Sequence, residues 1–179
     1  MAATKTTRAA RATARAAAAK SKTLWKDASP DAIALLEADH REVDALFDQF
    51  EQAASDADKK ALAAQICLAL KVHAQIEEEL FYPPARDETG DGDLIDEAVV
   101  EHAGAKILVA QIEAMLPGQD LYDAKVKVLG EQVRHHVREE EDELFPEVRD
   151  SGVDLKGLGA AMAARKAELM ALLAPTSIA

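Results

Sequence analysis

The sequence predicts an all-α protein built around an up-down antiparallel four-helix bundle. The composition favours helix, because Ala, Leu, Glu, Lys and Arg are abundant while there are only 8 Gly and 6 Pro in 179 residues. Apolar residues recur at helical spacing in four long segments. Short proline, glycine or polar breaks separate these segments, and short connections make consecutive helices antiparallel neighbours.

The predicted elements begin with a basic, low-complexity extension over residues 1 to 28, which has no apolar stripe. The first helix follows Ser29-Pro30-Asp31, a helix-start signal, and runs to about residue 54. A polar break at 55 to 58 leads into the second helix, which Pro83-Pro84 should end.

Two glycines predict a loop over residues 86 to 93, before the second pair of helices. The third helix covers about 94 to 116 and stops at Pro117-Gly118, and the fourth covers about 121 to 148. An amphipathic segment at 155 to 173 predicts a fifth helix that caps the bundle, with dimerisation as the alternative. The chain therefore divides into an extension (1–28), a bundle (29–150) and a C-terminal helix and tail (151–179).

Charge is distributed unevenly along the chain. The formal net charge is -12, yet residues 1 to 26 hold seven of the 21 basic residues and none of the 33 acidic ones. An acidic bundle repels the phosphate backbone, so we expect nucleic acid to bind at most weakly, through the basic extension. That extension suits a disordered solubilising tail, a weak contact to DNA or another acidic partner, or an organelle targeting peptide.

The sequence constrains the cellular compartment only through features that it lacks. No apolar run approaches the roughly 20 residues that a membrane helix needs, and we expect no membrane contact. The single cysteine, Cys67, excludes an internal disulfide and a Cys-rich zinc site; we predict a buried structural thiol that faces away from the histidines. These features favour a cytoplasmic protein, and the oligomeric state stays open.

The histidines mark an internal repeat. His40 precedes His73 by 33 residues, and His102 precedes His136 by 34. Each second histidine is followed by a glutamate four residues later, Glu77 or Glu140, and by a proline ten residues later. The pattern predicts two copies of a helix pair, related by an approximate two-fold axis.

All six of these side chains are predicted to face the bundle interior. Each histidine lies within an apolar stripe, and a glutamate four residues after a histidine shares its face. On the fourth helix, the positions three before and eight after are apolar for His136 but polar for His135. We therefore predict that His136 and Glu140 point inward, while His135 is exposed or lies at a helix boundary.

This set of donors indicates metal binding. Two carboxylates enclosed without partners would each cost of the order of several kcal/mol, and a central cation removes that cost. Imidazole and carboxylate without thiolate suit iron, manganese or zinc, and six side chains are too many for one tetrahedral zinc. We predict two octahedral ions, each with two histidines, bridged by Glu77, Glu140 and a solvent-derived oxygen (oxo or hydroxo), each with about one open position.

These motifs resemble the hemerythrin-like, or HHE cation-binding, domain family over about residues 32 to 148. The resemblance rests on the acid-His pairs Asp39-His40 and Glu101-His102 and on the two His-x3-Glu strings that end in Phe and Pro. It implies two non-haem iron ions as the cofactor. The implied iron ligands are His40, His73, His102 and His136, with Glu77 and Glu140 as bridging carboxylates.

Two positions depart from the oxygen-carrying hemerythrins. Lys106 stands where those proteins have a fifth ligand histidine, and Glu141 stands where they have an aspartate, with Glu140 just before it. The pattern is more similar to family members that handle nitric oxide or peroxide or repair iron-sulfur centres. The neighbouring acids Glu78, Glu79, Glu139, Glu141 and Asp142 are predicted to form a solvated face, with proton relay or iron attraction as the alternative.

The expected function is binding of, or reaction with, a small ligand such as oxygen, peroxide or nitric oxide in an oxidative or nitrosative stress response. Whether the protein turns over a substrate stays open. One alternative is a non-catalytic iron-sensing, oxygen-sensing or iron-handling module that acts through a partner. A metal-free interaction bundle is the other.

Overall fold

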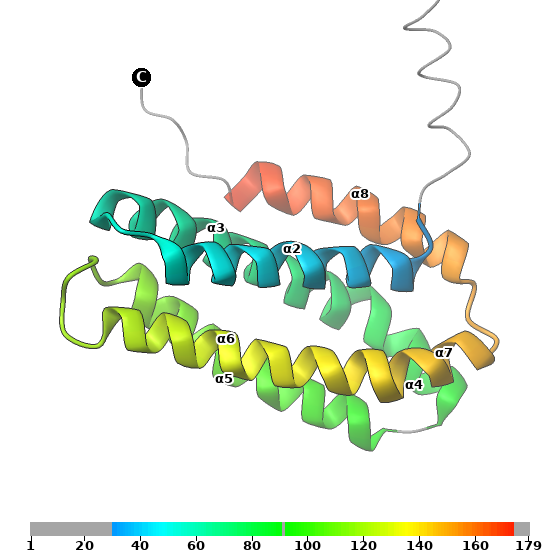
Figure 1. Cartoon of the computed structure of the whole chain (residues 1–179). Coiled ribbons are helices and arrows are strands. Elements are labelled where there is room, and N and C mark those ends of the chain that lie inside the picture. The colour runs from blue at the N-terminus through cyan, green and yellow to red at the C-terminus, as the bar shows by residue number, and fades with distance from the viewer. Residues whose placement is uncertain (1–29, 91, 174–179) are drawn as a thin grey trace, which may run out of the picture.

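The computed structural model describes residues 30–90 and 92–173, and the predicted basic extension lies outside them (Figure 1). The described residues are almost entirely helical and form no strand. Two antiparallel helix pairs build the bundle, which confirms the predicted fold class. The pairs are α2 (Ala32–Gln52) with α3 (Asp56–Ile76), and α5 (Asp93–Glu113) with α6 (Tyr122–Glu139).

Each half of the repeat continues past its second helix through a π-helical turn. In the first half η1 (Glu77–Phe81) leads into α4 (Tyr82–Thr89), and in the second η2 (Glu140–Leu144) leads into α7 (Phe145–Asp150). The prolines of both strings fall in the first turn after the π segment, where a missing N–H is tolerated.

The prediction that Pro83-Pro84 ends the second helix was therefore wrong. The wider π turn accommodates both prolines, and the helix continues to Thr89. It ends at Gly90, which adopts a left-handed backbone with φ of 72°. The loop predicted over residues 86 to 93 is correspondingly shorter.

The fifth helix is α8 (Leu155–Leu173), with the bounds that the sequence predicted. It lies along the side of the α2–α3 pair rather than across an end of the bundle (Figure 1). Its close approach depends on Gly159, where an added Cβ would lie 2.5 Å from the Pro30 carbonyl oxygen and 2.7 Å from the Ala32 nitrogen. None of the described helices is both long enough and apolar enough to cross a membrane.

Replacing Gly159 with alanine should therefore destabilise the packing of α8. We expect the free energy of unfolding to fall by about 1–3 kcal/mol, because backbone atoms that cannot move aside occupy the space of the new methyl group. Denaturant unfolding of the full chain measures this. Gly104→Ala is the matched control: its Cβ would meet nothing within 4 Å, so it should stabilise helix α5 by about 0.5–1 kcal/mol. Equal stability of Gly159→Ala and the unchanged protein would contradict the packing.

Two hydrophobic clusters fill the bundle on either side of its middle. The cluster that contains Leu36, Phe81 and Phe145 includes residues of α4, α7 and α8, and the cluster around Phe47 and Leu129 fills the other end. Cys67 is buried in the second cluster, as predicted, and burial raises the pKa of its thiol to about 11. The polar side chains enclosed between these clusters form the candidate site.

Candidate metal centre

The structure brings all six predicted side chains together in the middle of the bundle. One histidine comes from each bundle helix, and each glutamate is the first residue of a π segment. Every one of the six is buried, and Glu77 is 0 % exposed. The set comprises His40, His73, Glu77, His102, His136 and Glu140.

The imidazoles form two pairs. The Nε2 atoms of His40 and His73 are 3.1 Å apart, and those of His102 and His136 are also 3.1 Å apart. Two donors at right angles around a cation, with bonds of about 2.1 Å, lie about 3 Å from each other. Each pair therefore fits two adjacent positions of one octahedral ion.

Both carboxylates lie between the two histidine pairs. Oε2 of Glu77 is 3.2 Å from Nε2 of His73 and 3.4 Å from Nε2 of His102. Oε2 of Glu140 is 3.3 Å from Nε2 of His40 and 3.5 Å from Nε2 of His136. Each carboxylate thus contacts one histidine of each pair, which is the position that a bridging carboxylate requires.

The oxygen atoms of these carboxylates are short of hydrogen-bond donors. Both oxygens of Glu77 and Oε2 of Glu140 are buried and accept no hydrogen bond from the described residues. Burial, and then the charge of Glu140, raise the pKa of Glu77 well above its usual range. Burial also raises the pKa of Glu140. The effects of His136 and His40 outweigh burial, and they lower the pKa of Glu140 to about 2. A cation between the pairs would satisfy these oxygens, so the donor set fits a metal centre.

The outward nitrogen of each imidazole faces an acid from another helix. These contacts are His40–Glu141 at 2.8 Å, His102–Glu78 at 2.9 Å, His136–Glu101 at 2.8 Å and His73–Asp39 at 3.7 Å, each measured from Nδ1 to a carboxylate oxygen. The first three are hydrogen bonds, and in each the acid holds the proton at Nδ1 and turns the Nε2 lone pair toward the centre. Nδ1 of His73 faces Asp39 but forms no hydrogen bond within the described residues. The prediction of a merely solvated acidic face was wrong for Glu78 and Glu141, which are partly exposed but bind histidines.

Tyr82 belongs to the site and was not predicted. Its buried hydroxyl donates to Oε1 of Glu140 at 2.9 Å and lies 3.4 Å from Nε2 of His102. The equivalent residue of the repeat is Phe145, whose ring stacks on His40 with a centroid distance of 5.8 Å. Both follow their histidine by nine residues, so aligning the two strings could have found them. Burial, followed by the charges of Glu77 and Glu140, raises the pKa of Tyr82 well above its usual range, so the hydroxyl keeps its proton.

His135 and Lys106, whose positions the sequence made notable, lie at the edge of the centre. The side chain of His135 is 54 % exposed and ion-pairs with Glu139, in agreement with the predicted register. Lys106, at the position of the fifth histidine in oxygen carriers, binds the two carboxylate oxygens of Glu78 at 2.6 and 2.7 Å. It therefore contacts an acid that orients His102.

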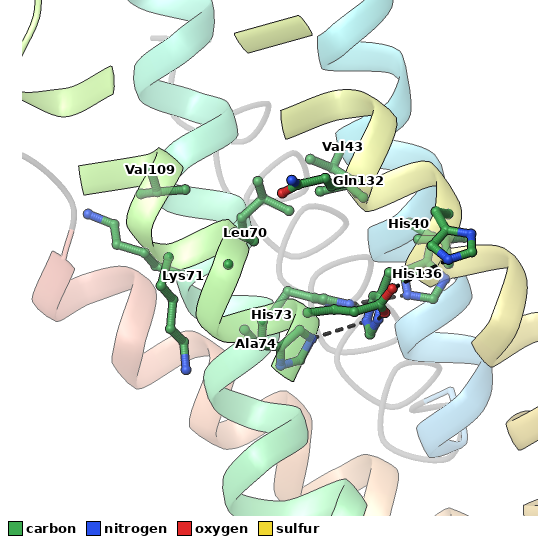
Figure 2. Close-up of a pocket in the computed structure, with 17 residues that line it drawn as sticks. His40, Val43, Leu70, Lys71, His73, Ala74, Val109, Gln132 and His136 are labelled. Carbon is green, nitrogen blue, oxygen red and sulfur yellow. Dashed lines mark hydrogen bonds and ion pairs between the residues drawn. The ribbon is translucent and has the colours of Figure 1, made fainter. Parts of the chain in front are cut away.

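A cavity of about 230 Å³ adjoins the four histidines. Figure 2 shows His40, His73 and His136 on one side of it and Val43, Leu70 and Val109 on the other. A dry cavity of about 150 Å³ is enough to hold benzene. The space therefore admits a diatomic molecule or a peroxide to the edge of the centre.

Metal uptake should depend on pH through His40. Burial lowers the pKa of His40, but Glu140 and Glu77 outweigh it and raise the pKa to about 9. The metal-free protein thus holds a proton on this imidazole at pH 7, and a metal ion must displace it. We expect the apparent Fe²⁺ affinity to rise about tenfold per pH unit for each proton released between pH 7 and 9. Anaerobic competition with a chelator of known pH dependence measures this, and an affinity that does not change with pH would contradict it.

Comparison with known proteins gives three findings. The family model of the hemerythrin HHE cation binding domain matches residues 31–148. A protein of Nostoc sp. named DNA nickase is 34 % identical over 113 residues, which are 63 % of this chain and 32 % of the relative, so the chain spans about a third of that relative. The crystal structure of a hemerythrin HHE cation binding domain-containing protein from Mycobacterium kansasii superposes with a TM-score of 0.68 at 24 % identity, covering 80 % of this chain and 89 % of that one. The last likeness shows the fold.

Proposed function

Because the chain belongs to the hemerythrin HHE cation binding domain family, we propose that it holds two non-haem iron ions that bind or react with oxygen, peroxide or nitric oxide. His40 and His73 would hold one ion, His102 and His136 would hold the other, and Glu77 and Glu140 would be shared between the two. The observation that supports this most strongly is the crossed arrangement, in which each carboxylate contacts one histidine of each 3.1 Å pair. Such a protein would serve an oxidative or nitrosative stress response.

The chain's own residues prepare the centre for this role. Bound iron would supply electrons and a Lewis acid for chemistry on the small ligand. Hydrogen bonds from acids at Nδ1 hold the imidazoles of His40, His102 and His136 in one orientation, and Tyr82 keeps a proton beside Glu140. The mostly apolar cavity gives a small ligand a path to the histidines while limiting the access of bulk water.

Optical spectra of the iron-reconstituted protein test the proposal directly. After anaerobic loading we expect about two iron ions per chain, and spectra that change on addition of oxygen, azide or nitric oxide. Purification without chelators followed by metal analysis separates this from a metal-free interaction bundle. Absence of bound iron, or spectra that none of the three ligands alters, would reject the proposal.

Filling the cavity tests the path of the ligand. Ala105→Phe places a ring in the cavity lining, and we expect slower azide binding with unchanged iron content. Ala103→Phe is the matched control, because Ala103 is exposed on the same helix. Equal azide rates in both variants would show that ligands reach the centre by another route.

One contact favours the alternative of a non-catalytic sensing or iron-handling module. Asp39 faces Nδ1 of His73 at 3.7 Å and also ion-pairs with Lys166 of α8, so a change at His73 can reach the fifth helix. Peroxide consumption by the iron-loaded protein and by Glu140→Ala separates the two functions. Equal rates defeat the enzymatic account, and a change in α8 hydrogen exchange on iron loading favours the sensor.

A further inference from the structure

The two halves of the repeat differ on the faces that flank the centre. Alignment of His73 with His136 pairs Val72 with His135 and Ile76 with Glu139. In the first half these positions are apolar and buried, at 1 % and 0 % exposure, on the side where α8 packs against α2 and α3. In the second half the same positions carry an imidazole and a carboxylate whose side chains are 54 % and 30 % exposed.

The acids at the equivalent positions Asp39 and Glu101 are neutralised differently. Asp39 forms an ion pair with Lys166 of α8. Glu101 pairs with His135 and His136, and within the described residues neither it nor Glu139 has an ion pair with lysine or arginine. In the first half of the repeat, the covered half against which α8 packs, Lys166 thus neutralises Asp39. In the second half, the open half, the carboxylates of Glu101 and Glu139 instead converge on the side chain of His135.

The three donors of the open half are already gathered. Nε2 of His135 is 3.2 Å from Oε1 of Glu139 and 3.6 Å from Oε1 of Glu101, and one donor atom from each residue lies within 4.8 Å of the others. The second oxygen of Glu101 is occupied, because it accepts from Nδ1 of His136 at 2.8 Å. Oε1 of Glu101 therefore points to the surface cluster while Oε2 holds the central histidine.

We propose that Glu101, His135 and Glu139 hold a divalent cation at the surface, beside the central site and distinct from it. Its charge would offset the two carboxylates, as Lys166 offsets Asp39. An imidazole with two carboxylates suits Fe²⁺, Mn²⁺ or Zn²⁺. Three protein donors leave positions for water, so this ion exchanges more readily than the buried ones.

The surroundings connect this site with the centre. Glu101 and His135 both line the cavity of about 230 Å³ that reaches the four histidines. A second void, of about 10 Å³, has Glu101, Glu139, His136 and Glu140 among its lining residues, and its volume is close to that of one water molecule. The surface cation would therefore sit at an opening of the metal centre.

Calorimetric titration of Zn²⁺ into the iron-loaded full chain tests the proposal. We expect one equivalent of zinc to bind while the iron, measured on the recovered protein, is retained. His135→Ala and Glu139→Gln should each weaken zinc binding at least about tenfold without changing the iron content. Glu131→Gln removes an exposed acid from the same helix and should leave zinc binding unchanged.

The inference fails if the iron-loaded protein takes up no zinc, if zinc enters only by displacing iron, or if His135→Ala binds it as tightly as the unchanged protein. The site does not depend on the central iron. Glu77→Met is expected to lose the central iron, and zinc can then also occupy the vacant central histidines. Adding His135→Ala to Glu77→Met should still remove one equivalent of bound zinc, so failure of the centre and failure of this site give different results.

Discussion

Replacing His73 or His136 with alanine is expected to lower bound iron and thermal stability together. Each substitution removes one of the two imidazoles of a 3.1 Å pair. Metal that binds the folded state alone stabilises it by about 2.7 kcal/mol at a hundredfold excess over Kd. At roughly 2–4 °C per kcal/mol for a chain of this size, losing that contribution lowers the Tm by about 5–10 °C.

The neighbouring histidine provides the matched control. His135 lies next to His136 but has a side chain that is 54 % exposed, so His135→Ala should retain the central iron and the Tm of the loaded protein. Iron content and calorimetric unfolding are measured on all three variants. Unchanged iron in both His73→Ala and His136→Ala would reject these residues as ligands.

Replacing Glu77 with methionine should have opposite effects on the two forms of the protein. Both oxygens of Glu77 are buried without hydrogen-bond donors, so an apolar side chain of similar length suits the metal-free interior better. We expect the free energy of unfolding of the metal-free protein to rise by about 1–4 kcal/mol. Bound iron should fall sharply, because one of the two bridging carboxylates is lost.

The pH dependence of Glu77→Met gives a second signature. The pKa of Glu77 is raised well above the ordinary 4.5, first by burial and then by Glu140. Its ionisation therefore opposes folding, and it removes stability from the metal-free protein as pH rises above 4.5. The variant should lack this loss, as denaturant unfolding at several pH values would reveal.

Glu140→Met is the control for that experiment, since Glu140 accepts the Tyr82 hydrogen bond and lies beside His40. Removing it leaves a buried donor unpaired, so the metal-free protein should become less stable, by about 1–3 kcal/mol. If Glu77→Met destabilises the metal-free protein as much as Glu140→Met does, the Glu77 carboxylate is not an unsatisfied group in the metal-free interior.

Helical periodicity was sufficient to predict that the six donor side chains face inward. The apolar neighbours of His136 placed that residue rather than His135 in the interior, and the segment at 155 to 173 proved to be a helix with those bounds. The end of the second helix could not be predicted in the same way, because the helix continues through Pro83-Pro84. A proline normally ends a helix, and only the π turn before it reveals that the helix continues.

Contacts between helices were harder to infer from the sequence than the side of each helix that faces the interior. The acids that bind Nδ1 come from helices other than those of their histidines, and Glu78 and Glu141 resemble ordinary surface charges in a string of glutamates. Tyr82 reaches the centre because the π turn brings the fifth residue after Glu77 onto the same face. The difference between the two halves depends on where α8 packs, which no local pattern specifies.

Diffraction at the iron absorption edge from crystals of the iron-loaded protein would locate the bound ions. We expect two anomalous peaks, one about 2.1 Å from Nε2 of both His40 and His73, the other equally close to Nε2 of both His102 and His136. Glu77 and Glu140 should each contact both peaks. A single peak, or iron bound outside these six side chains, would contradict a dinuclear centre in this bundle.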